Sequence, residues 1–212
     1  MLKKRLIFTV LVLTLVAVTA GCGSSHKSVQ TKHSNDQSAP IQQSTAANKE
    51  QPLAPEKNPV GDIPDSQVFV KYISNQGGYE LKVPEGWARK IRGSDASFTD
   101  KFDGIEVKIS QSAKAPSPES VKVDQAATLQ KTGRAVEIKS ISEVTLNGGS
   151  AVLIKFNSNS EPEQVTGKQV RLDNEEFLFY KNGKIAALRL WAPLGADNVD
   201  QWKLISNSFR WL

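Results

Sequence analysis

The side chains that most often carry out chemistry are missing from the longest part of this chain. Residues 66–212 contain no histidine, no cysteine and no glycine-rich phosphate loop. Serine and cysteine hydrolases rely on these residue types to form and activate their nucleophile, and structural zinc sites are built on the same types. We therefore expect no such nucleophile, no metal site and no cofactor here. Carboxylates, lysines, arginines, tyrosines and hydroxyls remain.

Two groups of acidic residues are spaced closely enough to act together. Asp100 and Asp103 form one group, and the other comprises Asp173, Glu175 and Glu176. A carboxylate pair can hydrolyse a glycosidic bond, and a larger cluster of oxygen ligands can hold calcium. The first pair flanks a turn, and the second group supplies too few ligands. We expect solvated turn and loop charges, and no enzyme.

Three other side chains are candidates for binding a ligand or a partner. Trp87 follows a turn, Trp191 ends a strand, and Arg189 precedes Trp191 by two residues. Tryptophan and arginine are enriched at the centres of binding sites. Packing in the core or at a sheet edge is the alternative for all three residues, and the sequence leaves this choice open.

The amino terminus has the order of an export signal. Residues 3–5 are basic, residues 6–18 are almost entirely apolar, and Ala20-Gly21 supplies small residues before Cys22, the single cysteine. This pattern resembles a bacterial lipoprotein signal. The resemblance implies cleavage of residues 1–21, a diacylglyceryl group on Cys22 and a location on the outer side of the cell membrane. The alternative is an uncleaved anchor helix with an incidental cysteine.

Residues 22–65 are predicted to form a disordered linker after the lipidated cysteine. Residues 23–64 have no aromatic residue and hold five of the ten prolines, so they bury too little apolar surface to offset ordering. His26 and His33 lie in this linker, where solvated filler is favoured over a metal site. All four tryptophans lie in residues 66–212, which are long enough for one buried core.

The net charge of +5 does not indicate a nucleic-acid-binding protein. Residues 1–22 contribute +3, residues 23–65 have 4 basic and 5 acidic side chains, and residues 66–212 have 20 and 17. Residues 23–65 thus contribute −1 and residues 66–212 contribute +3, so the chain after the signal carries a net charge of only +2. This balance is too even for a basic nucleic-acid surface.

Hydrophobic periodicity predicts strands, a helix, further strands and a final helix. Several strands are apolar on both faces, which favours a sheet covered on both sides. The predicted fold is therefore α+β, an α/β/α sandwich with a mostly antiparallel sheet. The expected strands are 68–73, 79–83, 87–91, 96–102, 105–109 (with a turn at Asp103-Gly104), 135–146, 151–156, 165–180 (with a kink at Asp173-Asn174) and 184–191. The expected helices run from Ser117 to Gly133 and onward from Asp197.

Asn182-Gly183 is the clearest hairpin signal, since both residues tolerate the positive φ of a type I′ turn. A two-residue turn places Lys181 opposite Lys184, and counting outward places Glu176 opposite Arg189. We therefore expect a cross-strand ion pair between Glu176 and Arg189.

Short motifs of the domain resemble the PsbP-like superfamily. They are Gly78–Trp87, Ser97–Asp100 with Val107–Ile109, and the ending Asn198–Phe209. Together with the lipoprotein signal they resemble its bacterial LpqN-type lipoproteins, over residues 68–212. The resemblance implies an α/β/α sandwich and members that mainly bind partners, and it implies no reaction.

The leading functional hypothesis is a membrane-anchored, extracytoplasmic and non-catalytic binding module. Its expected partners are the lipid bilayer, through acylated Cys22, and another envelope protein. The alternatives are an envelope-polymer hydrolase that uses a carboxylate pair, and a carrier of a small ligand in an apolar pocket.

Overall fold

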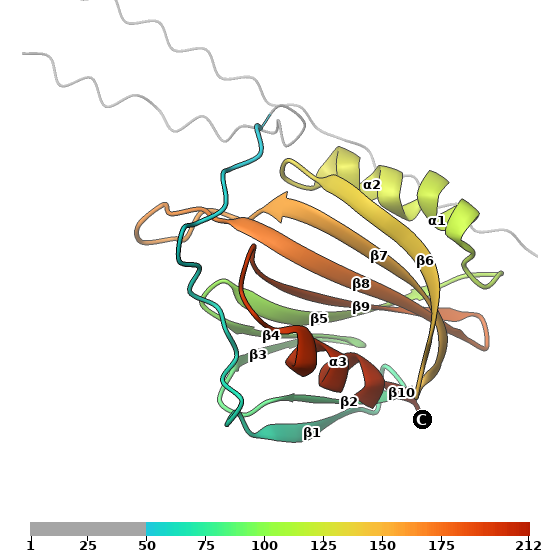
Figure 1. Ribbon diagram of the computed structural model, residues 1–212. Coiled ribbons are helices and arrows are strands. Elements are labelled where there is room, and N and C mark those ends of the chain that lie inside the picture. Colours follow the sequence, from blue (N-terminus) through green and yellow to red (C-terminus); the bar gives the residue numbers. More distant parts are fainter. Residues whose placement is uncertain (1–49) are drawn as a thin grey trace, which may run out of the picture. The chain divides into compact units, whose positions relative to one another are not determined.

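The computed structural model describes residues 50–212, and Cys22, His26 and His33 lie outside these residues. Figure 1 shows two sheets and three helices in this part of the chain. In chain order the elements are β1 (Phe69–Ser74), β2 (Tyr79–Pro84), β3 (Ala88–Arg92), β4 (Asp95–Asp100), β5 (Asp103–Gln111), α1 (Pro118–Val123), α2 (Gln125–Thr132), β6 (Glu137–Leu146), β7 (Gly149–Asn159), β8 (Arg171–Lys181), β9 (Lys184–Pro193), α3 (Val199–Ser208) and β10 (Arg210–Trp211).

The larger sheet has seven strands in the order β3-β4-β5-β9-β8-β7-β6, and every neighbouring pair is antiparallel. Each face packs against a different layer (Figure 1). On one face, α1 and α2 contribute Val121 and Leu129 to a cluster with Leu178 of β8. On the other face, α3 and the small sheet β1-β2-β10 pack over the main core. The predicted α+β class is confirmed, and the small sheet in one outer layer is an addition to the predicted sandwich.

The hairpin at Asn182-Gly183 has the predicted register. The two turn residues have φ values of 49° and 79°, and Lys181 pairs with Lys184. Glu176 stands opposite Arg189, and the two side chains form an ion pair of 2.8 Å. The expected cross-strand pair is confirmed, because a tight turn fixes every pairing that follows it.

The turn predicted at Asp103-Gly104 lies two residues earlier. Asp100 pairs with Asp103 across a turn at Lys101-Phe102, and Lys101 adopts a φ of 50°. Gly104 is a strand residue opposite Trp191. A Cβ on Gly104 would lie 1.9 Å from Cζ2 of Trp191, so this glycine makes room for the indole and does not form a turn.

Two other predicted elements differ from the structure. The helix expected from Ser117 to Gly133 is divided at Asp124, whose φ of −98° and ψ of −70° depart from regular helix geometry and separate α1 from α2. The strand expected from residue 165 begins only at Arg171 and has no break at Asn174. Asn174 is buried and donates to Oγ of Ser158 at 3.1 Å, so its polar amide is satisfied inside a continuous strand.

The linker prediction is wrong for residues 50–65, which lie along the domain and are called the strap here. Ile63 is 5% exposed and joins the main core. Its N–H donates to Oδ1 of Asn198 at 2.6 Å, and Nδ2 of Asn198 donates to the carbonyl of Gly61 at 2.7 Å. The packing of Ile63 in the core and the two hydrogen bonds with Asn198 hold the end of the strap, although its composition indicated disorder.

The start of the strap is held by a separate polar cluster. Glu50 forms an ion pair of 2.9 Å with Arg134, and Nδ2 of Asn159 donates to Oε1 of Glu50 at 3.0 Å. Asn159 also accepts from the N–H of Leu53 at 3.0 Å. These contacts attach residues 50–53 to the domain, well before residue 66.

Replacing Ile63→Ala is expected to lower the free energy of unfolding by about 2–3 kcal/mol, since it opens a cavity where the strap meets the core. Val60→Ala is the matched control, because Val60 lies in the same segment and is 62% exposed. Urea unfolding followed by tryptophan fluorescence measures both variants. Equal stability of the Ile63 and Val60 variants would show that the strap is not part of the cooperative fold.

Candidate functional site

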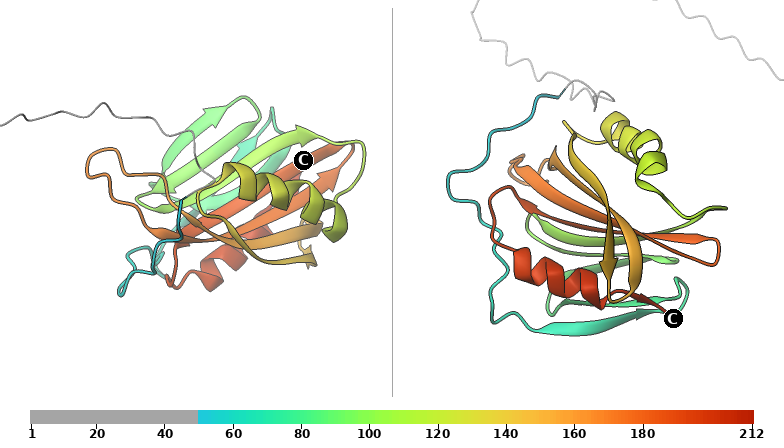
Figure 2. Two further views of the ribbon diagram at one scale, coloured as in Figure 1. Left: turned by 90° about the horizontal axis from the view of Figure 1, so that it is seen from above. Right: turned by 45° about the vertical axis from the view of Figure 1, so that its right-hand side comes forward.

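The helices leave one end of the seven-stranded sheet uncovered. α1 and α2 pack over β6 and β7 and reach Leu178 of β8 and Ile185 and Ala187 of β9. Seen from above in Figure 2, the green strands β3 and β4 lie clear of both helices. We call the helix-facing side of β3, β4 and β5, together with Arg189 and Trp191 of β9, the open face. Its side chains include Lys90, Arg92, Asp95, Ser97, Thr99, Glu106, Lys108, Arg189 and Trp191.

A row of polar side chains crosses this face at right angles to the strands. Each member stands directly opposite the next: Lys90, Ser97, Glu106, Arg189 and Glu176. Arg189 therefore lies between two carboxylates, one on each neighbouring strand. Opposite charges directly across a ladder stabilise the sheet and fix the orientation of the long side chains.

Arg189 is held in place by a buried carboxylate. Glu176 is only 1% exposed, and its carboxylate accepts from Nε of Arg189 at 2.8 Å and from Nε2 of Gln125 in α2 at 2.6 Å. The guanidinium also lies 5.4 Å from the centre of the Phe156 ring, within range of a cation–π contact. The contacts with Glu176 use Nε and Nη2 and leave Nη1 for another acceptor.

Trp191 lies beside Arg189 on the same face. Its indole crosses β5 above Gly104 and is half-buried. Both residues line a groove of about 910 Å³, bounded by Phe102 on one side and by the 158–165 segment on the other. A half-exposed indole with a guanidinium beside it offers an apolar surface and a hydrogen-bond donor to the same ligand.

The third candidate, Trp87, lies elsewhere. It is half-buried and packs against the main core, on the side of the sheet covered by α3 and the small sheet. The structure therefore brings Arg189 and Trp191 together and leaves Trp87 apart. Trp87 has the role of a packing residue, which was the alternative for all three.

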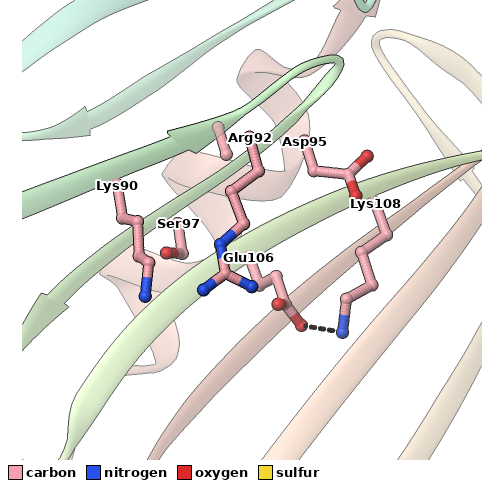
Figure 3. A pocket seen from close by; sticks show the side chains of 7 residues that line it. Lys90, Arg92, Asp95, Ser97, Glu106 and Lys108 are labelled. Atoms are coloured by element: carbon pink, nitrogen blue, oxygen red, sulfur yellow. Dashed lines mark ion pairs between the residues drawn. The ribbon is translucent and has the colours of Figure 1, made fainter. Parts of the chain in front are cut away.

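A second hollow of about 270 Å³ lies on the open face next to the Trp191 groove, and sequence reasoning missed its residues. Figure 3 shows Lys90 and Arg92 of β3 projecting toward Glu106 of β5. Glu106 forms an ion pair of 2.9 Å with Lys108. Lys90 and Arg92 are two residues apart, so the sequence alone places them on one face of a strand. No local pattern, however, indicates that β5 pairs with β9.

The two carboxylate groups considered for catalysis are placed differently. Asp100 and Asp103 stand directly opposite each other where β4 turns into β5. Along β8, alternation places Glu176 on the face opposite to Asp173 and Glu175. Glu175 pairs with Lys155. In residues 50–212, no group of three or more His, Cys, Asp or Glu side chains is placed to hold a metal ion.

Asp103 nevertheless has an unusual environment. The pKa of its carboxyl group is raised to about 7, chiefly by burial and also by the nearby Asp100 and Asp62, while Lys101 opposes this change. Oδ1 of Asp103 has no hydrogen-bond partner within the described residues. The carboxyl lies against the strap, where a Cβ on Gly61 would be 2.9 Å from Oδ1.

No helix among residues 50–212 is long and apolar enough to cross a membrane. No family model matches the chain, and no curated protein sequence matches it.

The fold is similar to several solved structures. PsbP of the cyanobacterium Synechocystis has 15% identity and a TM-score of 0.47, over 72% of this chain and 99% of that one. The Ran-binding protein Mog1p of Saccharomyces cerevisiae has 11% identity and a TM-score of 0.44, over 68% and 96%. A protein of Bacteroides thetaiotaomicron has 10% identity and a TM-score of 0.42, over 67% and 48%. Similarity at this level does not establish a shared function.

Proposed function

We propose that this chain is an extracytoplasmic lipoprotein, anchored to the cell membrane through Cys22, whose folded part is a non-catalytic module that binds another envelope protein. Membership of the LpqN-type lipoproteins of the PsbP-like superfamily is part of this proposal. It rests on the signal pattern before Cys22 and on the motifs from Gly78 to Phe209.

The observation that carries the proposal is the open face. The β3–β5 end of a large sheet face lacks a covering layer, although the rest is packed under α1 and α2 as far as Ile185 and Ala187 of β9. A half-buried tryptophan and an anchored arginine sit in a groove on this face. Grooves with such residues are typical of binding surfaces.

The experiment places a photo-crosslinking residue at Lys108 on the open face and, as the matched control, at Lys139 on β6. Their side chains are similarly exposed, at 59% and 52%. We expect the Lys108 position to yield a discrete crosslinked protein in intact cells and the Lys139 position to yield none.

Cys22→Ser should abolish incorporation of a labelled fatty acid and release the chain from the membrane fraction. Equal crosslinking at both positions, or lipid label on the Ser variant, contradicts the proposal.

A further inference from the structure

We propose that the open face recognises an acidic, extended segment of its partner protein, with a carboxylate received between Lys90 and Arg92 and an apolar side chain placed on Trp191. This inference rests on the proposed function and specifies the chemistry of the partner.

The charges around the smaller hollow are incompletely balanced. Lys108 is neutralised by Glu106 at 2.9 Å, and Oδ1 of Asp95 accepts from the N–H of Ile109 at 2.9 Å. Lys90 and Arg92 form no ion pair within residues 50–212, although both project over the hollow in Figure 3. The hollow holds three cations, Lys90, Arg92 and Lys108, and two carboxylates, Asp95 and Glu106. Its one excess positive charge favours a carboxylate supplied by a partner.

The strand β3 extends this positive character. Its sequence from residue 88 to 92 is Ala-Arg-Lys-Ile-Arg, and all five residues are exposed. β3 is also an edge of the seven-stranded sheet. Charges on an edge strand discourage pairing with a second copy of the same strand, because like charges would oppose one another. The charges therefore disfavour a β3–β3 dimer and favour an acidic partner.

A protein segment fits the hollow better than a membrane surface does. The carboxylates of Glu106 and Asp95 lie among the cations, in the floor and wall of the hollow. A flat anionic bilayer would bring many phosphates against these carboxylates at once. A narrow segment can place one carboxylate between Lys90 and Arg92 and keep its other groups away from Glu106.

The register of the sheet sets the spacing of the recognised segment. The two hollows adjoin, since both are lined by Lys90 and Glu106. The Trp191 indole lies over Gly104 of β5, two strand spacings or about 10 Å from β3. Gly104 is in the row of Ala88, about 10 Å along the strands from the midpoint between Lys90 and Arg92, so the diagonal distance is about 14 Å. An extended segment covers this distance in about four residues. Since side chains alternate along an extended chain, an acid at one position and an apolar residue four positions later face the same way.

The test uses the full chain, purified in detergent, and a synthetic peptide of Gly and Ser that carries one Glu and one Phe four residues later. Fluorescence anisotropy of a labelled peptide measures the affinity. We expect binding that weakens as salt increases, and that falls at least about tenfold for Lys90→Glu/Arg92→Glu. Lys122→Glu/Lys131→Glu is the matched control, with the same change of charge on exposed helix positions. A peptide with Lys in place of Glu should bind the Lys90→Glu/Arg92→Glu variant better than it binds the natural chain.

Several results overturn the inference. They are no peptide binding, equal binding by both double variants, or peptide affinity that is unchanged when Phe is moved by one position. A chain that binds phosphatidylglycerol vesicles through Lys90 and Arg92, and not the peptide, contacts lipid there. If crosslinking at Lys108 captures a partner and Lys90→Glu/Arg92→Glu leaves that capture unchanged, this inference fails and the proposed function stands. If crosslinking captures nothing, the proposed function itself fails.

Discussion

Replacing Asp103→Asn is expected to stabilise the protein at pH 8 by up to about 4 kcal/mol and to have no comparable effect at pH 4. The pKa of this carboxyl is about 7 in the folded chain, against 3.8 for the unperturbed group. The difference of about 3 corresponds to about 4 kcal/mol. Burial against the strap is the main cause, and Asp100 and Asp62 add to it.

The sign follows from proton binding. The folded state holds the proton of Asp103 more tightly than the unfolded state does, so the stabilising contribution is fully present below about pH 3.8. It is lost progressively as the pH rises to about 7, where the folded carboxyl ionises. Asparagine carries no charge and does not show this loss.

Urea unfolding of both proteins between pH 4 and pH 8 measures this effect, and the difference between them removes the contributions of all other titrating groups. Glu143→Gln is the control, since this carboxyl is exposed and lies on β6, away from Asp103. We expect it to change the stability only slightly. A difference between Asp103→Asn and the natural chain that does not vary with pH would show that Asp103 is ionised in the folded state.

Replacing Arg189→Met is expected to lower the free energy of unfolding by about 3–4 kcal/mol. The substitution keeps the aliphatic stem near Phe156 and leaves the carboxylate of Glu176, which is 1% exposed, with Gln125 as its remaining partner. Removing one member of a buried pair costs more than the pair contributes, because the other charge stays buried without compensation.

Replacing the other member of the pair should lower the free energy of unfolding by less. Glu176→Gln leaves an arginine whose side chain is 28% exposed and can be hydrated, so we expect a loss of about 1 kcal/mol. The double variant should be more stable than the sum of the single effects implies, by about 2 kcal/mol. Thermal and urea unfolding of all four proteins complete this cycle. Additive effects would show that the two side chains do not act as a pair.

Local signals in the sequence determined the hairpin of β8 and β9. Asn182-Gly183 supplied the two positive φ values, and the turn fixed the pairing as far as Glu176 and Arg189. The same register places Phe177 opposite Leu188, and both side chains lie in the main core. These features follow from interactions between residues close in the chain, which is why they could be predicted.

Glycine and composition were less reliable guides. Asp103-Gly104 has the sequence of a turn, yet Gly104 lies in a strand because the Trp191 indole occupies the space of its missing side chain. The strap has the composition of a linker, yet Ile63 is buried. Its backbone N–H donates a hydrogen bond to Asn198, which lies 135 residues later in the chain. In both cases a distant partner decided the outcome of an ambiguous local pattern.

The sequence by itself determined the absence of histidine and cysteine from residues 66–212, the order of β1 to β9, and the pair of Glu176 with Arg189. Only the tertiary structure placed β5 beside β9, which brought Lys90 and Glu106 into one row with Arg189. Only it left this end of the sheet open and buried Asp103 under the strap. The reason is physical: register within a hairpin depends on a few adjacent residues, whereas the order of distant strands depends on how the whole chain buries its apolar surface.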